Sequence, residues 1–145
     1  MVSTASRLIS QDQAFDWIEK IVHAAESDGV SVAIAETESA LGRFGENQIR
    51  QNLQKNQFEL SITSYSGSCS ASVTTIEQDW EGILAALRRS EALAMVAPAD
   101  PEWVPLLDKQ VYEDRPAKFD ELTFNASPLQ RGELIQRVCQ WSTGA

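Results

Sequence analysis

Apolar residues at every second position dominate the stretch from residue 30 to residue 75, and this spacing is that of β-strands. Three alternating runs are present: Val30, Val32 and Ile34; Phe58, Leu60 and Ile62; and Cys69, Ala71 and Val73. The turn-forming residues 65–68 separate the last two runs, so we expect an antiparallel hairpin around Gly67. The other faces of these two strands are rich in Ser and Thr, which predicts a sheet face that is solvated or faces a partner.

Capping boxes mark the start of two predicted helices. Ser10 is followed three positions later by Gln13, and an apolar stripe at helical spacing then continues towards residues 28–29, where Asp-Gly is expected to end the helix. Near the end of the chain, Ser127–Gln130 repeats the capping box with proline at the first helical position. Its helix is expected to carry the apolar stripe Leu134, Ile135, Val138 and Cys139.

A further helix is expected between the hairpin and the proline-rich part of the chain. It starts after Thr75 or Glu77 and runs to about Ala97, because prolines follow at residues 98 and 101. Its apolar face is formed by Trp80, Ile83, Leu84 and Leu87. Residues 98–125 mix prolines, charges and scattered aromatic side chains, so we expect a long ordered connection that is pinned onto the domain or a partner.

The order of these elements predicts an α+β fold. Consecutive strands with short connections favour an antiparallel sheet, here of three to four strands packed against helices on one face. Residues 1–9 are expected to form a flexible N-terminus, and residues 10–145 a single domain.

The charge balance excludes some classes of partner. The 145 residues contain 12 Lys and Arg against 21 Asp and Glu, a net charge of −9, which argues against direct nucleic-acid binding through the surface as a whole. No apolar run reaches the ~18–20 residues that a membrane span needs, so no membrane association is expected. With no secretory signal pattern and two cysteines, the predicted location is cytoplasmic.

The sequence offers no catalytic or metal motif. The lone His23 cannot form a two-histidine zinc helix, and no glycine-rich phosphate loop or nucleophile elbow is present. Cys69 and Cys139 follow the apolar patterns of a strand and a helix, which favours buried and inert thiols. We therefore predict no catalytic residue, no metal ligand and no cofactor in this chain.

An unusual polar stretch, RFGENQIRQNLQKN, occupies residues 43–56. Six of its fourteen residues are Asn or Gln, whose side chains both donate and accept hydrogen bonds. Part of it, Arg43–Asn52, could be a separate strand that is irregular around Gly45. The composition suits either a solvated edge strand or an edge that makes polar contacts with another backbone.

At this stretch the sequence resembles the N-terminal domain of the TldD/PmbA family, also called modulators of DNA gyrase. The resemblance runs from about Leu8 to Val138 and rests on an ordered set of segments: VSVAIAETES, RFGENQIRQN, the strand pair around residues 65–75, DWEGILAALRRSEALAMVAP, PADPEW, the pair Leu106 and Leu107, and SPLQRGELIQRV. Nothing in these residues points to gyrase itself.

The resemblance implies a role in proteolysis. Members are cytoplasmic zinc metalloproteases or their inactive partner subunits, they form homodimers or heterodimers, and they are thought to bind extended peptide by β-augmentation. Their zinc ligands lie in the C-terminal half, and no position here matches them. This chain would then be the non-catalytic N-terminal domain, forming cavity wall or dimer surface, with a TldD/PmbA-like subunit or C-terminal domains of its parent as partner.

The motif positions that carry over are Arg43, Asn47, Gln51 and Asn52, as candidates for peptide or partner binding, and Phe44, which is expected in the core. Two other interpretations stay open. The chain could be a free-standing adaptor that pairs with a separate TldD-like subunit, or an unrelated α+β domain that binds a small molecule, such as a hydrolase that uses carboxylates.

Overall fold

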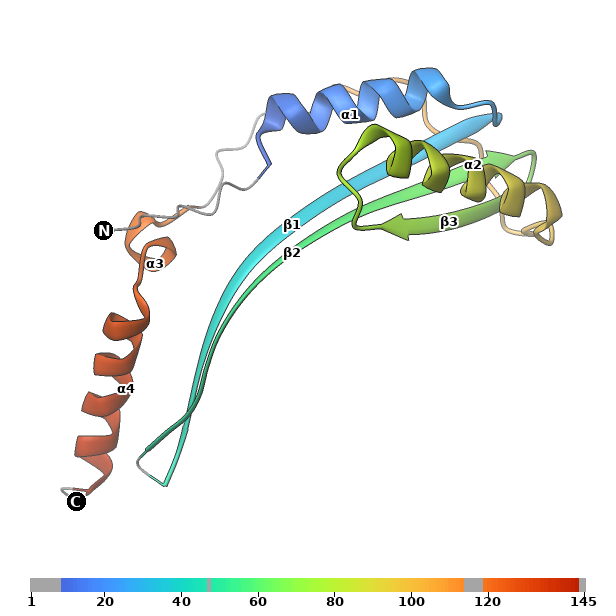
Figure 1. The fold of residues 1–145 in the computed structure, drawn as a ribbon. Helices are drawn as coiled ribbons and strands as arrows, with labels where there is room; N and C mark the ends of the chain where they lie inside the picture. Colours follow the sequence, from blue (N-terminus) through green and yellow to red (C-terminus); the bar gives the residue numbers. More distant parts are fainter. Residues whose placement is uncertain (1–8, 47, 114–118, 144–145) are drawn as a thin grey trace. The chain divides into compact units, whose positions relative to one another are not determined.

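The structure, a computed structural model, describes residues 9–46, 48–113 and 119–143. Its elements, in chain order, are α1 (Gln11–Ala24), β1 (Gly29–Gly45), β2 (Gln48–Ser66), β3 (Cys69–Thr75), α2 (Trp80–Val96), α3 (Glu121–Phe124) and α4 (Pro128–Thr143) (Figure 1). An antiparallel sheet with separate helices confirms the predicted α+β class. The predicted flexible N-terminus lies outside the described residues, apart from Ile9.

The chain groups into two compact units. The first unit contains Met1–Thr37 and Asn56–Asp108, and the second contains Glu38–Lys55 and Lys109–Ala145. Strands β1 and β2 contribute residues to both units. That residues 10–145 behave as one domain stays a prediction.

The sheet has the order β1-β2-β3. Strand β3 pairs antiparallel with the end of β2, in a register that runs from Leu60 opposite Thr75 to Ser66 opposite Cys69. The hairpin predicted around Gly67 is therefore confirmed. Gly67 has a φ of 55°, and its N–H donates to the Asp28 carboxylate at 2.8 Å.

The first two strands are longer than the sequence pattern predicted, at 17 and 19 residues. The possible separate strand Arg43–Asn52 does not exist: its first residues end β1, its last residues begin β2, and the chain turns between them at Glu46, which has a φ of 51°. Arg50 forms an ion pair with Glu46 across this turn. The polar residues conceal the strands because they carry no alternation of apolar side chains.

The core of the first unit lies between one face of the sheet and the helices α1 and α2, as predicted (Figure 1). It is formed by Ile21 of α1, Phe58, Leu60 and Ile62 of β2, and Ile83, Ala86 and Leu87 of α2, with the inward side chains of β1 packed against them. The opposite face carries exposed hydroxyls, and Ser61 and Thr63 lie within 3.3 and 2.5 Å of Thr74 and Ser72, respectively.

Helix α1 begins as predicted but ends earlier. The Ser10 hydroxyl accepts the N–H of Gln13 at 3.2 Å. The expected end at residues 28–29 is wrong, because the helix stops at Ala24. Beyond it, the N–H groups of Glu26 and Ser27 donate to a carboxylate oxygen of Glu91 in α2, at 2.6 and 3.2 Å. This contact across the fold fixes the chain in a non-helical course before the glycine is reached.

Helix α2 begins after Thr75 and Glu77 and ends at Val96, as predicted, and its N-cap is Asp79. The Asp79 carboxylate accepts the N–H of Gly82 at 2.9 Å. Thr75 is still paired in the sheet, and its hydroxyl accepts the N–H of Glu77 at 3.1 Å, so it forms a turn before the helix begins. The buried hydroxyls of Ser64 and Ser90 lie 2.7 Å apart where α2 covers β2.

The connection after α2 is largely irregular, as predicted, and contains the short helix α3 near its end. In the first unit its Leu106 packs on Gly29, where an added Cβ would lie 2.6 Å from the leucine Cδ1. The predicted capping box of α4 is confirmed: the N–H of Gln130 donates to the Ser127 hydroxyl at 3.2 Å, and the Gln130 side chain accepts the N–H of Ser127 at 2.7 Å. Over the described ranges, no helix combines the length and hydrophobicity that a bilayer crossing requires.

Replacing Gly67 with alanine is expected to lower the free energy of unfolding by about 1 kcal/mol, because a side chain strains the left-handed backbone. No atom lies within 4 Å of the added Cβ, so the effect comes from the backbone alone. Urea denaturation measures it. The matched control is Gly45→Ala, whose Cβ would meet the nearest atom, Arg50 Cγ, at an ordinary 3.8 Å. Equal stabilities of the two variants would contradict the prediction.

Candidate functional site

The sheet has an open edge along β2. Strand β3 pairs with β2 only from Leu60 onwards, whereas β2 begins at Gln48. In the first unit, the residues Gln57–Glu59, just before this pairing, therefore have β1 on one side and, within the described ranges, no strand on the other. An open edge presents backbone N–H and C=O groups that can pair with another extended chain. This edge continues the line of β3.

Hydrogen bonding identifies which residues point their backbone groups towards this edge. The carbonyl of Tyr65 accepts the N–H of Asp28 at 3.0 Å, so its backbone groups point to the β1 side. In an antiparallel strand these directions alternate from residue to residue, and the register with β3 runs without interruption. Phe58 lies an odd number of positions from Tyr65, so its N–H and C=O point towards the open edge.

A small hollow lies beside the edge where β3 ends. Its volume is about 450 Å³, and it is lined by Glu36, Asn56, Gln57, Phe58, Glu59, Ile76 and Gln78, all of the first unit. The Asn56 amide donates to the Glu36 carboxylate at 3.2 Å. Ile76, the residue after β3, is 72% exposed. The hollow thus combines amide and carboxylate groups with two apolar side chains next to the open edge of β2.

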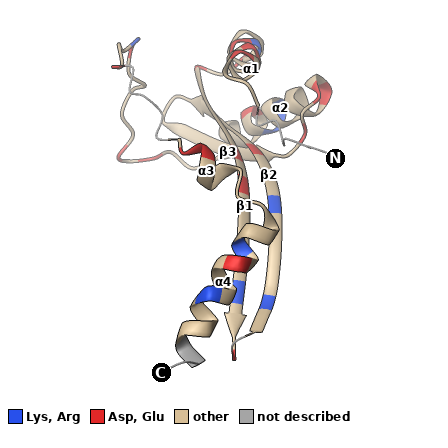
Figure 2. Ribbon diagram, turned by 90° about the vertical axis from the view of Figure 1, so that its left-hand side faces the viewer, with Lys and Arg blue, Asp and Glu red and all other residues tan. Residues whose placement is uncertain are grey.

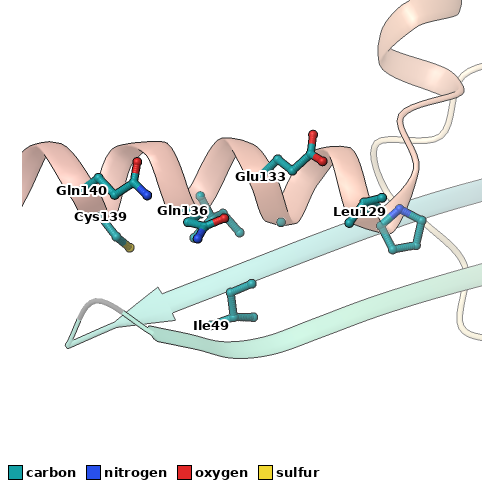
Figure 3. A pocket seen from close by; sticks show the side chains of 9 residues that line it. Ile49, Leu129, Glu133, Gln136, Cys139 and Gln140 are labelled. Atoms are coloured by element: carbon teal, nitrogen blue, oxygen red, sulfur yellow. The ribbon is translucent and has the colours of Figure 1, made fainter.

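The second unit has a larger and more apolar hollow of about 690 Å³ (Figure 3). It lies between α4 and Ile49, which belongs to the hairpin formed by the end of β1 and the start of β2. From α4 it is lined by Pro128, Leu129, Gly132, Glu133, Ile135, Gln136, Cys139 and Gln140. Ile49 points from β2 towards α4, and Cys139 points from α4 towards the hairpin (Figure 3). Cys139 is buried, as expected, whereas Cys69 is partly exposed.

The described residues among the predicted peptide- or partner-binding positions lie on the hairpin of β1 and β2, but they line neither hollow. Arg43, Gln51 and Asn52 are exposed, and none of them lines a hollow. Asn47 lies outside the described residues. The expectation that Phe44 belongs to the core is wrong, because its side chain is 50% exposed.

The sequence analysis predicted an edge strand at residues 43–56, but the sequence does not reveal where β2 begins, nor the part of its edge that β3 leaves open. A difference in strand length could have indicated it. The polar residues continue directly into the apolar strand after them, which makes β2 long, whereas β3 has only seven residues and cannot cover all of it. Among the described residues, no group of three or more His, Cys, Asp or Glu is arranged to hold a metal ion.

No protein-family model matches the sequence, and no curated protein matches it either. Among solved structures, the crystal structure of TldE from Thermococcus kodakarensis is similar, with a TM-score of 0.74 and 16% sequence identity. The match covers 83% of this chain but only 28% of the TldE chain. At this identity the likeness concerns the fold. The chain therefore shares the fold of a part of TldE, and its predicted resemblance to the TldD/PmbA family is confirmed at the level of the fold.

Proposed function

We propose that this chain is the non-catalytic N-terminal domain of a TldD/PmbA-type zinc metalloprotease, or of its inactive partner subunit, and that it binds extended peptide. The observation that carries the proposal is the open edge of β2 in the first unit, at Gln57–Glu59. The fold shared with TldE supports the family assignment. Zinc and catalysis belong to C-terminal domains of the parent or to a TldD/PmbA-like partner subunit, in the cytoplasm.

The proposed binding mode is β-augmentation. In this mode an extended peptide pairs with β2 before Leu60, in line with β3 and, like β3, antiparallel to β2. Main-chain hydrogen bonds to residues such as Phe58 supply the affinity, which makes binding tolerant of peptide sequence. Alternate peptide side chains meet the hollow beside Ile76. A domain that presents peptides of varied sequence to a protease requires this tolerance.

Backbone methylation of the peptide tests the mode directly. The probe is a fluorescent, uncharged, proline-free peptide of about eight residues, titrated with the 145-residue chain. Two derivatives carry N-methyl groups at alternate sets of residues. Because only one set of N–H groups points to β2 in an added strand, one derivative is expected to lose about tenfold or more in affinity while the other binds nearly as well as the parent. Equal affinity of the two derivatives, or no binding of the parent peptide, would overturn the proposal.

A variant of the hollow locates the binding site. Ile76→Glu is expected to weaken binding of the same peptide about tenfold, because it places an additional carboxylate beside Glu59 and removes apolar contact. Met95→Glu is the matched control, since Met95 is 71% exposed and lies on α2 outside the hollow. Both substitutions lie on the surface, so both variants should fold. The same affinity for the two variants would place the peptide elsewhere.

A further inference from the structure

Two carboxylates line the hollow beside the open edge of β2, and their surroundings differ. The Glu36 carboxylate is already engaged, because one of its oxygens accepts the N–H of Ile9 and the other accepts the Asn56 amide. Glu59 is exposed, and its side chain forms no hydrogen bond or ion pair with any other described residue. The hollow therefore contains one carboxylate that is free to pair with a ligand.

Glu59 continues a row of side chains that pair across β2 and β3. On the exposed face of the sheet, hydroxyl groups of the two strands contact each other in two directly opposite pairs: Ser61 with Thr74, and Thr63 with Ser72. Side chains alternate along a strand, so Glu59 lies on this same face. Strand β3 ends at Thr75, opposite Leu60, and supplies no strand residue opposite Glu59. In an added strand, a peptide side chain takes that position.

The hollow offers apolar surface beside this free carboxylate. Phe58 and Ile76 line it together with Glu59, and Ile76 is largely exposed. Lysine and arginine side chains combine an apolar stem, which packs on apolar surface, with a cationic head that stays in water. A lysine or arginine of the peptide opposite Glu59 can therefore place its stem against Ile76 and its head at the carboxylate. A neutral side chain can make only the first of these contacts.

The charge of the first unit favours the same class of ligand. Its segments 1–37 and 56–108 contain four Lys and Arg and fourteen Asp and Glu, a net charge of −10. Figure 2 shows acidic positions on both α1 and α2. Lys20 is paired with Asp16, Arg88 is paired with Glu26 and Glu91, and no basic residue lines the hollow. Such a surface attracts cationic peptides and repels anionic ones.

We infer that the open edge of β2 prefers basic extended peptides, and that Glu59 determines this preference by pairing with a lysine or arginine side chain of the peptide. The inference rests on the proposed function, because it requires a peptide strand beside β2, and it adds the chemical class of that peptide. Main-chain hydrogen bonds still supply most of the affinity, so the preference is moderate and other positions of the peptide stay variable.

Peptides that differ at one position test the inference. They share a neutral, fluorescent sequence of about eight residues, carry lysine, norleucine or glutamate at one central position, and are titrated with the full 145-residue chain. Norleucine keeps the apolar stem of lysine and lacks its charge. The lysine peptide is expected to bind about fivefold more tightly than the norleucine peptide, and the glutamate peptide about threefold more weakly than the norleucine peptide.

A substitution that removes only the charge identifies the residue responsible. Glu59→Gln should bring the affinities of the lysine and norleucine peptides to within about twofold of each other, because the amide keeps the size of the side chain. Glu81→Gln is the matched control. It makes the same charge change at an exposed position of the same unit, on α2 and outside the hollow, and should keep the fivefold preference.

The possible failures of the two proposals can be told apart. If the wild type bound the lysine and norleucine peptides equally well, the inference would be overturned while peptide binding at β2 stood. A preference for lysine that Glu59→Gln keeps, or that Glu81→Gln loses to the same extent, would come from the charge of the whole unit and would overturn the role of Glu59. If none of the peptides bound, the proposed function would fail and the inference with it.

Discussion

Replacing Glu91 with alanine is expected to lower the free energy of unfolding by about 2–4 kcal/mol. Glu91 is 8% exposed; its carboxylate accepts the N–H groups of Glu26 and Ser27, and Arg88 donates to it at 2.7 Å. Alanine leaves these donors without their acceptor where α1 gives way to β1. Since that turn positions β1 beside β2, the loss affects the frame that holds the sheet.

Urea denaturation at neutral pH measures the effect. Glu91→Gln should fall between the wild type and Glu91→Ala, because an amide oxygen still accepts one N–H but carries no charge for Arg88. The control is Glu81→Ala, which removes an exposed carboxylate from the same helix. If Glu91→Ala were no less stable than this control, the carboxylate would not be holding the turn.

The same carboxylate predicts a dependence of stability on pH. Burial raises the pKa of Glu91, but hydrogen bonds from the N–H of Glu26, the Arg88 side chain and the N–H of Ser27 outweigh it, so the pKa lies below its usual 4.5. A lowered pKa means that the unfolded chain binds the proton more tightly. The stabilisation by Glu91 is therefore complete above pH 4.5 and is lost as the pH falls through the folded-state pKa. The stability difference between wild type and Glu91→Gln should shrink over that acidic interval.

Signals within a few residues of one another predicted much of the fold. The N-cap at Ser10, the capping box at Ser127, the glycine of the hairpin turn and the alternation of apolar residues in β3 all act locally, and the structure confirms each of them. Local signals suffice there because turn and cap geometry depends on hydrogen bonds between near neighbours.

Long-range contacts decided the features that the sequence did not reveal. Helix α1 ends early because its following N–H groups bond to Glu91, some 65 positions away. Strand β2 is long because it pairs with β1 through the polar stretch, although its Asn and Gln residues have no apolar alternation. The candidate site arises from the same cause. The open edge exists because β3 is shorter than β2. Arg43, Gln51 and Asn52 were predicted from residue type and family motif. Neither of these signals indicates which edge of a strand is open.

Replacing Leu87 with alanine is expected to have the largest effect on stability, a loss of about 3–5 kcal/mol. Leu87 is fully buried and packs in the cluster formed by α1, α2 and β2. Its truncation removes apolar contact and leaves a cavity that a sheet covered by two helices cannot readily fill. Leu93→Ala is the matched control, because Leu93 lies on the same helix but is 42% exposed, so it should lose less than about 1 kcal/mol.

Urea denaturation of the two leucine variants measures this contrast, and similar losses would show that α2 is not anchored through Leu87. The result also bears on peptide binding. Helix α2 packs on β3, and the end of β3 defines where the open edge of β2 begins. Under conditions in which Leu87→Ala is still folded, its affinity for the neutral peptide should match the wild type, because Leu87 lies outside the hollow. As urea unfolds the variant, peptide binding should fall in proportion to the folded fraction, since the edge exists only while β2 is held in the folded sheet.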